Sequence, residues 1–132
     1  NANPASMEAS LRLVAGLPGR KAVVLGDMLE LGATEDEWHL RIVALAESLG
    51  FDRVVLVGPR MHRARHAAPG AFAFEGPDSP AHSPTGGGVT AADRVREWLR
   101  GESDVVLFKG SRGAKVERVL HQVQGETEQG DH

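Results

Sequence analysis

Two kinds of apolar pattern follow one another in turn along the chain, and each kind predicts one type of secondary structure. Four short runs of consecutive apolar residues predict buried strands, because a strand covered on both faces does not alternate between apolar and polar positions. Apolar residues three and four positions apart predict amphipathic helices between these runs. This order favours a three-layer α/β domain with a mostly parallel sheet and right-handed crossovers. The predicted strands are residues 21–25, 53–57, 71–74 and 104–108.

The first helix is predicted from its end signals. Asn3 is suited to cap a helix whose first residue is Pro4. Pro18 and Gly19 follow as stop signals, so the helix is expected to reach about Leu17.

The second helix is predicted to begin at Thr34. Glu37 stands three residues after this hydroxyl and completes a capping box. His39 lies beside the expected apolar stripe, which predicts a packed or surface histidine, with a ligand contact as the alternative. Gly50 is the expected end of the helix. The expected buried stripe is Trp38, Ile42, Leu45 and Leu49.

The second half of the chain carries weaker signals. Thr90 and Asp93 repeat the spacing of a capping box and predict a further helix. Residues 75–88 are rich in proline and glycine and show no apolar period, which predicts a mobile loop. Residues 125–132 are predicted to be a disordered tail.

A basic turn follows the last predicted strand. Lys109, Ser111 and Arg112 stand between this strand and a helix expected to run to about Val123. Free backbone N–H groups at such a turn favour an anion, and the two cations would add charge. The alternative is that Ser111 only caps the helix while both cations are solvated.

Two carboxylates follow the first predicted strand. Asp27 and Glu30 lie in a loop bracketed by Gly26 and Gly32. Because the carboxyl ends of parallel strands share one edge of a sheet, this loop can neighbour the Lys109 turn, depending on the strand order.

Composition narrows the classes of function. A length of 132 residues indicates one domain, and a formal net charge of -3 gives no support for a nucleic-acid partner. The absence of cysteine excludes disulfide and thiolate chemistry and fits the cytoplasm. No apolar run is long enough to span a membrane. The chain begins with Asn1 rather than Met, and we expect it to be a piece of a longer protein.

The common sequence motifs of nucleotide enzymes and hydrolases are missing. The chain has no Gly-x-Gly-x-x-Gly after the first strand, no Walker loop and no Gly-x-Ser-x-Gly elbow. The most basic segment, residues 60–66, is interpreted as a solvated face, with an anion contact as the alternative. His62 and His66 are weak evidence for a metal site, and no metal is predicted. Spacing and composition thus indicate an anion-binding α/β domain and no narrower function.

Three segments combine small, polar and charged residues at predicted element ends. They are Asn1-Ala-Asn-Pro-Ala-Ser-Met7, Val24-Leu-Gly-Asp-Met-Leu-Glu-Leu-Gly32 with His39 behind it, and Leu107-Phe-Lys-Gly-Ser-Arg-Gly113 leading into Val116-Glu117. In this order and spacing, the segments resemble the carboxy-terminal domain of the Mur ligases. The resemblance implies a Rossmann-like fold for residues 1–124, and it is least evident in the loop 75–88.

The resemblance is strongest to the Mur ligases that add D-alanyl-D-alanine to UDP-N-acetylmuramoyl-tripeptide during peptidoglycan precursor synthesis. It implies a monomeric, cytoplasmic, three-domain enzyme that uses ATP and Mg²⁺. In such ligases the tripeptide carboxylate is phosphorylated by ATP, the dipeptide amine attacks the acyl phosphate, and a tetrahedral intermediate collapses to an amide and phosphate. The carboxy-terminal domain closes as a lid over these substrates, which orients them and excludes water.

The resemblance also implies roles for single residues. No catalytic residue and no Mg²⁺ ligand is expected in this chain, and the isolated domain is expected to be inactive. The residues expected to border ATP are Asn1, Asn3 and Pro4. The donors expected to bind the D-alanyl-D-alanine carboxylate are Lys109, Ser111 and Arg112. The residues expected to shape the site are Asp27, Glu30 and His39.

Two alternatives to a ligase domain stay open at this point. One is a free-standing Rossmann-like module that binds a small anion or a nucleotide. The other is a purely structural or interaction domain, in which the chain itself would block the Lys109 turn.

Overall fold

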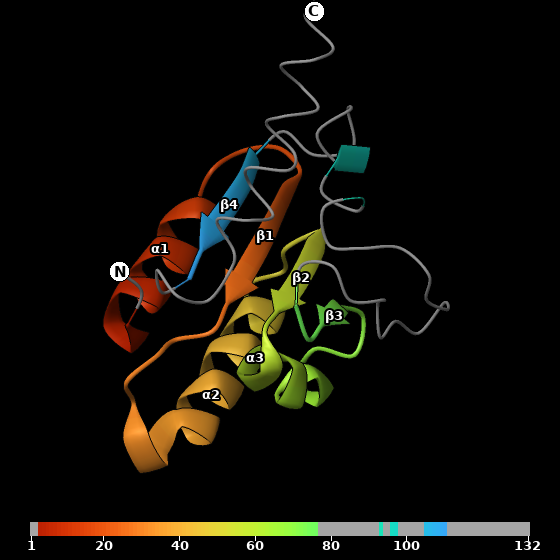
Figure 1. Ribbon diagram of the computed structural model, residues 1–132. Coiled ribbons are helices and arrows are strands. Elements are labelled where there is room, and N and C mark those ends of the chain that lie inside the picture. The colour runs from red at the N-terminus through yellow and green to blue at the C-terminus, as the bar shows by residue number, and fades with distance from the viewer. Residues whose placement is uncertain (1–2, 77–92, 94–95, 98–104, 111–132) are drawn as a thin grey trace, which may run out of the picture.

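A computed structural model describes residues 3–76, 93, 96–97 and 105–110. The elements alternate between strands and helices (Figure 1). They are α1 (Pro4–Ala15), β1 (Lys21–Gly26), η1 (Gly32–Thr34), α2 (Glu35–Ser48), β2 (Arg53–Val57), α3 (Pro59–Arg63), η2 (Arg65–Ala67), β3 (Phe72–Phe74) and β4 (Val105–Lys109).

The four described strands form one parallel sheet in the order β3-β2-β1-β4. The predicted α/β class and parallel sheet are therefore confirmed. From β1 the chain adds β2 and then β3 on one side, whereas β4 pairs with the other side of β1. The direction in which strands are added thus reverses between β1 and β4, and in open α/β sheets ligands bind outside the carboxyl ends of strands at such a point.

Both faces of the central strands are buried, as the uniform apolar runs predicted. On one face, side chains of β1 and β2 pack against α1, α2 and α3, and the core there includes Met7, Leu11, Leu25, Ile42, Leu56 and Met61. A second cluster on the other face comprises Ala22, Val24, Val55, Val57 and Phe74.

The helix predicted after Thr90 is described only at Asp93, Arg96 and Glu97, which are helical. The last predicted helix, most of the loop 75–88 and the tail 125–132 lie outside the described residues.

The predicted start of the first helix is confirmed. The side chain of Asn3 accepts a hydrogen bond from the Ser6 backbone N–H at 2.9 Å, and Pro4 is the first helical residue. The helix ends at Ala15, two residues before the predicted end, with Gly16 as its C-cap.

The second helix begins where it was predicted, with Thr34 at the N-cap position, but the predicted capping box is wrong. Thr34 makes no capping hydrogen bond to the helix, and its hydroxyl donates to the Leu31 carbonyl at 2.8 Å instead. A 3₁₀ turn precedes α2, so Thr34 has a backbone conformation close to helical rather than the extended one that an N-cap usually adopts.

The buried side of α2 is rotated from the predicted stripe. Trp38, Leu45 and Leu49 are only partly buried at the border of the core. The helix packs on the sheet while also contacting α1 and α3, so its buried sector faces between those neighbours. The fully buried residues of α2 are His39, Ile42, Val43 and Ala46.

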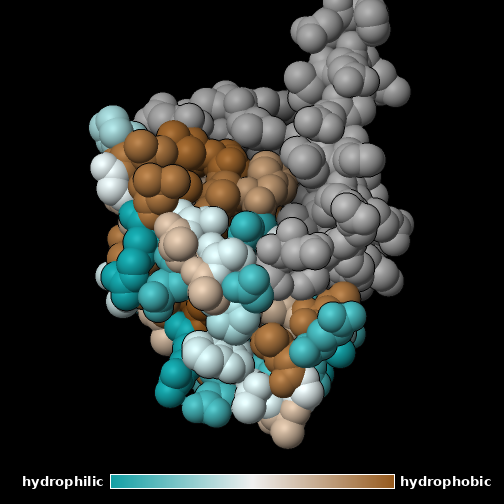
Figure 2. All heavy atoms as spheres, turned by 90° about the vertical axis from the view of Figure 1, so that its left-hand side faces the viewer, coloured by the Kyte–Doolittle hydropathy of each residue, from teal (hydrophilic) through white to brown (hydrophobic). Residues whose placement is uncertain are grey.

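The outer surface of α1 and the edge of the sheet differ in polarity. Leu13 and Leu17 are the exposed large hydrophobic residues among those described. Figure 2 shows the side of the molecule on which α1 lies, with an apolar area at the top and mostly hydrophilic residues below. The carboxyl ends of the strands point toward the lower end of the molecule in Figure 1, where the side seen in Figure 2 is mostly hydrophilic, and we call this end the polar edge. No helix among the described residues is long and apolar enough to cross a membrane.

Candidate substrate-binding edge

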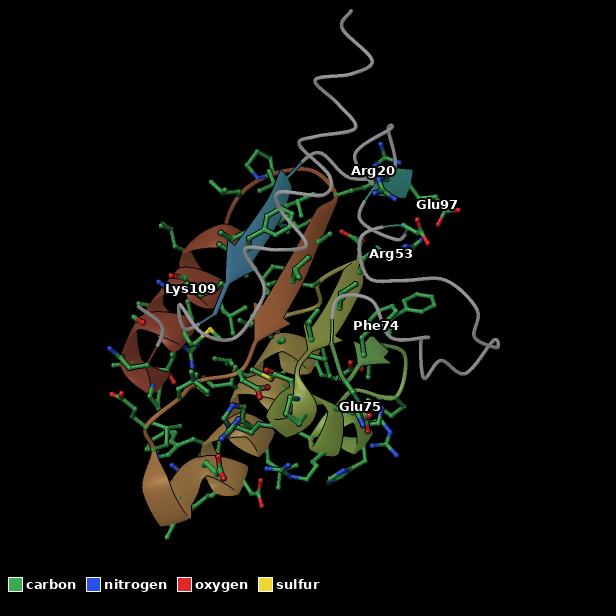
Figure 3. The ribbon with its side chains drawn as sticks, in the orientation of Figure 1. Arg20, Arg53, Phe74, Glu75, Glu97 and Lys109 are labelled. Atoms are coloured by element: carbon green, nitrogen blue, oxygen red, sulfur yellow. The ribbon has the colours of Figure 1, made fainter. Side chains whose placement is uncertain are left out.

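The carboxyl ends of the strands and the first turns of the helices share one edge of the molecule (Figure 1). Lys109 is the last residue of β4 and stands opposite Leu25 of β1 in the parallel register. Figure 3 shows Lys109 at the lower end of β4, near the start of α1, and α1 contacts β4. The loop that follows β1 therefore begins beside Lys109, as the sequence predicted for one of the possible strand orders.

Asp27 is the first residue after β1, and only 2% of its surface is exposed. Its Oδ1 atom accepts a hydrogen bond from the Met61 backbone N–H at 2.9 Å. Its Oδ2 atom accepts from the Arg60 backbone N–H at 3.1 Å. These N–H groups belong to the first turn of α3, which begins after the neighbouring strand. Asp27 thus caps a helix that is more than thirty residues away in sequence.

Gly58 holds the N-cap position of α3 and has no side chain to cap the helix itself. An ideal Cβ atom at this position would lie 2.4 Å from Oδ1 of Asp27. The φ angle of Gly58 is 121°, in a region that residues with a side chain rarely adopt. The helix therefore receives from Asp27, the residue after β1, the capping group that its own N-cap residue lacks.

Arg60 extends the contacts of Asp27 toward α2. Its Nη1 atom donates to Oδ2 of Asp27 at 3.2 Å, and its Nε atom donates to Oε2 of Glu35. The hydrogen bond with Glu35, followed by that with Asp27, raises the pKa of Arg60 above its ordinary value. The solvated-face interpretation of the basic segment is therefore wrong for Arg60, which is held between two carboxylates.

Arg63 makes a similar but more exposed contact on the next turn. Its Nη2 atom lies 3.0 Å from Oδ1 of Asp36, with side chains that are 52% and 67% exposed. The acidic first turn of α2 thus faces the basic side of α3. Sequence reasoning missed this pairing, although the signal was present in the excess of acids at the start of one helix and of bases in the other.

His39 is completely buried, and both of its ring nitrogens have partners. The Met28 backbone N–H donates to Nε2 at 2.9 Å. Nδ1 lies 2.5 Å from the Glu35 carbonyl oxygen, which can only accept. Nδ1 therefore carries the proton, and the neutral ring bridges α2 to the loop after β1. The prediction of a packed histidine is confirmed, and both ring nitrogens of His39 are used in hydrogen bonds to the protein's own backbone.

Glu30 is exposed and has a φ angle of 65°, the one left-handed conformation of a non-glycine residue in the described part of the chain. The loop around it is held at both ends, by the Met28 contact with His39 and by the bond from Thr34 to the Leu31 carbonyl. A backbone conformation of this kind is unfavourable for glutamate and persists when the surroundings determine it.

The remaining predicted site residues are only partly described. Asn3 lies at the start of α1, where its side-chain oxygen is engaged with Ser6, and Pro4 follows it. Asn1, Ser111 and Arg112 lie outside the described residues. Within the part of the chain that the structure describes, no three histidine or acidic side chains gather in a way that would hold a metal ion.

Comparison with known proteins places the chain in a family. Residues 1–112 match the family described as "Mur ligase, glutamate ligase domain". The chain belongs to the Mur ligase family. It is 33% identical over 131 residues to the UDP-N-acetylmuramoyl-tripeptide--D-alanyl-D-alanine ligase of Escherichia coli, an alignment that covers 94% of the chain.

Solved structures of Mur ligases share the fold. A crystal structure of MurF from Acinetobacter baumannii superposes with a TM-score of 0.76 at 25% identity, over 95% of this chain and 26% of that one. The MurF ligase of Thermotoga maritima, in complex with ADP, superposes with a TM-score of 0.72 at 25% identity, over 98% of this chain and 27% of that one. The chain spans about a quarter of the length of its curated relatives, 25% in the case of the Escherichia coli enzyme.

Proposed function

We propose that this chain is the lid domain of an ATP-dependent ligase that joins D-alanyl-D-alanine to UDP-N-acetylmuramoyl-tripeptide. The observation that carries the proposal is the position of Lys109 at the switch point of the sheet, in a chain similar over nearly its whole length to ligases of that name. The catalytic machinery would belong to the other three-quarters of the enzyme, and this domain would have no turnover alone.

Lys109 is the residue we assign to the incoming dipeptide. Lys109 is the last residue of β4 and lies at the polar edge, where a carboxylate can approach without being buried in apolar surroundings. Ser111 and Arg112 are proposed to complete the set of donors for that carboxylate. A charged contact of this kind fixes the dipeptide so that its amine can attack the activated tripeptide carboxylate.

The start of α1 is proposed to border the nucleotide. The T. maritima relative is named as a complex with ADP, which supports a nucleotide site in this family. Asn3 uses its side-chain oxygen to accept from Ser6, so its amide nitrogen is the group proposed to face the nucleotide, beside Asn1 and Pro4. The Mg²⁺ ligands are proposed to belong to the other three-quarters of the enzyme, and no group of three histidine or acidic side chains gathers among the described residues.

Asp27, Glu30 and His39 are proposed to shape the site. Two of them already have roles in the fold that serve this purpose, because Asp27 binds α3 and His39 binds the Met28 amide. Together they hold the loop that runs beside Lys109. We further propose that the whole enzyme is cytoplasmic and monomeric.

The proposal is tested with the full-length protein. Purified enzyme should form amide, ADP and phosphate only when ATP, UDP-N-acetylmuramoyl-tripeptide and D-alanyl-D-alanine are all present. Lys109→Ala should raise KM for D-alanyl-D-alanine roughly 10- to 100-fold, as expected when a charged hydrogen bond is lost, with little effect on KM for the tripeptide.

Two results would count against the proposal. Equal kinetics of the Lys109→Ala and wild-type enzymes would remove the assignment of this residue. Tight binding of ATP to the 132-residue chain alone, measured by calorimetry, would favour an independent nucleotide-binding module instead.

A further inference from the structure

We propose that Arg60 is a positioning residue for D-alanyl-D-alanine, and that it acts through Asp27 and Glu35 on the loop beside Lys109. This inference rests on the proposed function, because it concerns the same substrate site. Arg60 lies on α3 and is not among the residues expected to contact a substrate.

Arg60 connects three segments that meet at the polar edge. Through Oδ2 of Asp27 it contacts the residue at which β1 passes into the loop, at 3.2 Å. Through Oε2 of Glu35 it contacts the first turn of α2, which follows the same loop. Its own backbone N–H binds Asp27 again, at 3.1 Å. The two ends of the loop are therefore attached to one guanidinium group.

The burial of Asp27 makes its contact with Arg60 important for the position of the loop. The carboxylate is 2% exposed, so little water reaches it, and Arg60 is the cationic side chain that pairs with it among the described residues. Without the Arg60 guanidinium, the buried carboxylate would keep only the two backbone N–H groups of α3 as partners, and its position would be less restrained. Movement of Asp27 would displace Met28 and Glu30, and Leu25 just before them stands opposite Lys109 in the sheet.

The geometry of the contact requires arginine. Nε and Nη1 of one planar group donate to carboxylates on two different elements. A lysine ammonium carries the same charge but cannot place two donors in this fixed fork. The raised pKa of Arg60 agrees with a group that both carboxylates hold in its charged form.

Arg63 provides a matched comparison on the same helix. It pairs with Asp36 and lies 3.9 Å from Glu35, but its side chain is 52% exposed, compared with 31% for Arg60. No contact between Arg63 and Asp27 is present in the described residues. If charge on this face of α3 were all that mattered, the two arginines would be equivalent.

The experiment compares Arg60→Gln, Arg60→Lys and Arg63→Gln in the full-length ligase. We expect Arg60→Gln to raise KM for D-alanyl-D-alanine roughly tenfold, because small displacements of a positioning group have effects of this size or larger. Arg60→Lys should give an intermediate value, and Arg63→Gln should match the wild type. KM for UDP-N-acetylmuramoyl-tripeptide should not change in any variant.

A second measurement separates positioning from stability. Amide hydrogen exchange at residues 28–31 should be faster in Arg60→Gln than in Arg63→Gln, at a temperature where both variants are folded. Wild-type KM and wild-type exchange in Arg60→Gln would overturn the inference. If Arg60→Gln does not fold, the same two measurements on Arg60→Lys decide, and values equal to the wild type in that variant overturn it. A wild-type enzyme that does not use D-alanyl-D-alanine at all would instead refute the proposed function.

Discussion

The carboxylate of Asp27 occupies the space that a side chain on Gly58 would need, with 2.4 Å between Oδ1 and an ideal Cβ atom. The two residues follow adjacent parallel strands, and each depends on the other. Asp27 can reach the first turn of α3 because Gly58 has no side chain. Gly58 can serve as an N-cap because Asp27 supplies the acceptor.

Gly58→Ala should destabilise the chain more than an ordinary substitution of a left-handed glycine. The methyl group would meet the Asp27 carboxylate, and the φ angle of 121° is unfavourable for alanine. We expect a loss of about 1–3 kcal/mol in the free energy of unfolding from the backbone strain alone, and more from the clash. Urea denaturation measures the difference. Gly50→Ala is the control, because Gly50 has a φ angle of 74° and nothing within 4 Å of its ideal Cβ. Equal losses in both variants would show that the Asp27 contact is unimportant.

Asp27→Ala should lower stability by about 1–3 kcal/mol, because two backbone N–H groups and the Arg60 side chain lose their acceptor. Asp36→Ala is the comparison, since Asp36 is 67% exposed and pairs with Arg63 at the surface. Its effect should stay within about 0.5 kcal/mol. Thermal denaturation of both variants tests this, and a larger loss in Asp36→Ala would contradict the burial argument.

His39 should be observed as the neutral tautomer with the proton on Nδ1. This follows from its partners, since the Met28 N–H must donate to Nε2 and the Glu35 carbonyl must accept from Nδ1. Long-range ¹H–¹⁵N correlation spectra distinguish the two nitrogens directly. In His39→Phe the new ring would take the place of the imidazole, but the free energy of unfolding should fall by about 1–3 kcal/mol, because the Met28 N–H is left without an acceptor. A proton found on Nε2 would mean that the loop after β1 is arranged differently.

Glu30→Gly should be more stable than Glu30→Ala by about 1 kcal/mol, because glycine adopts a left-handed conformation without the steric cost that any side chain carries. Denaturant midpoints of the two variants provide the comparison. Both variants remove the same exposed carboxylate, so the loss of charge cancels between them. Equal stability would indicate that the backbone at this position is not left-handed in solution.

The strands were largely predictable from the sequence. The run 53–57 coincides with β2, and β1 and β3 differ from their predictions by single residues. The last strand is shifted by one residue, so Lys109 ends β4 instead of opening the turn after it. Uniform apolar runs are a local signal that survives folding, because strands buried on both faces need apolar residues at every position.

Contacts of the site residues were less predictable. The acids and the basic segment were visible in the sequence, and the loop after β1 was expected to neighbour Lys109 only for some strand orders. The pairing of Asp27 with α3, and of Arg60 with Glu35, joins residues that are 25 to 34 positions apart. No local sequence pattern indicates contacts between residues so far apart. The only local signal was weak: Gly58, the N-cap residue of α3, has no side chain with which to cap that helix.

By itself, the sequence determined the fold class, the start of the first helix and the buried strands, because these depend on hydrophobic periodicity and on residues within one turn of each other. Only the tertiary structure decided that β4 lies beside β1, that Asp27 caps α3, and that His39 belongs to the core. The physical reason is that a buried polar group must find its partner in space, and that partner depends on which strands are neighbours.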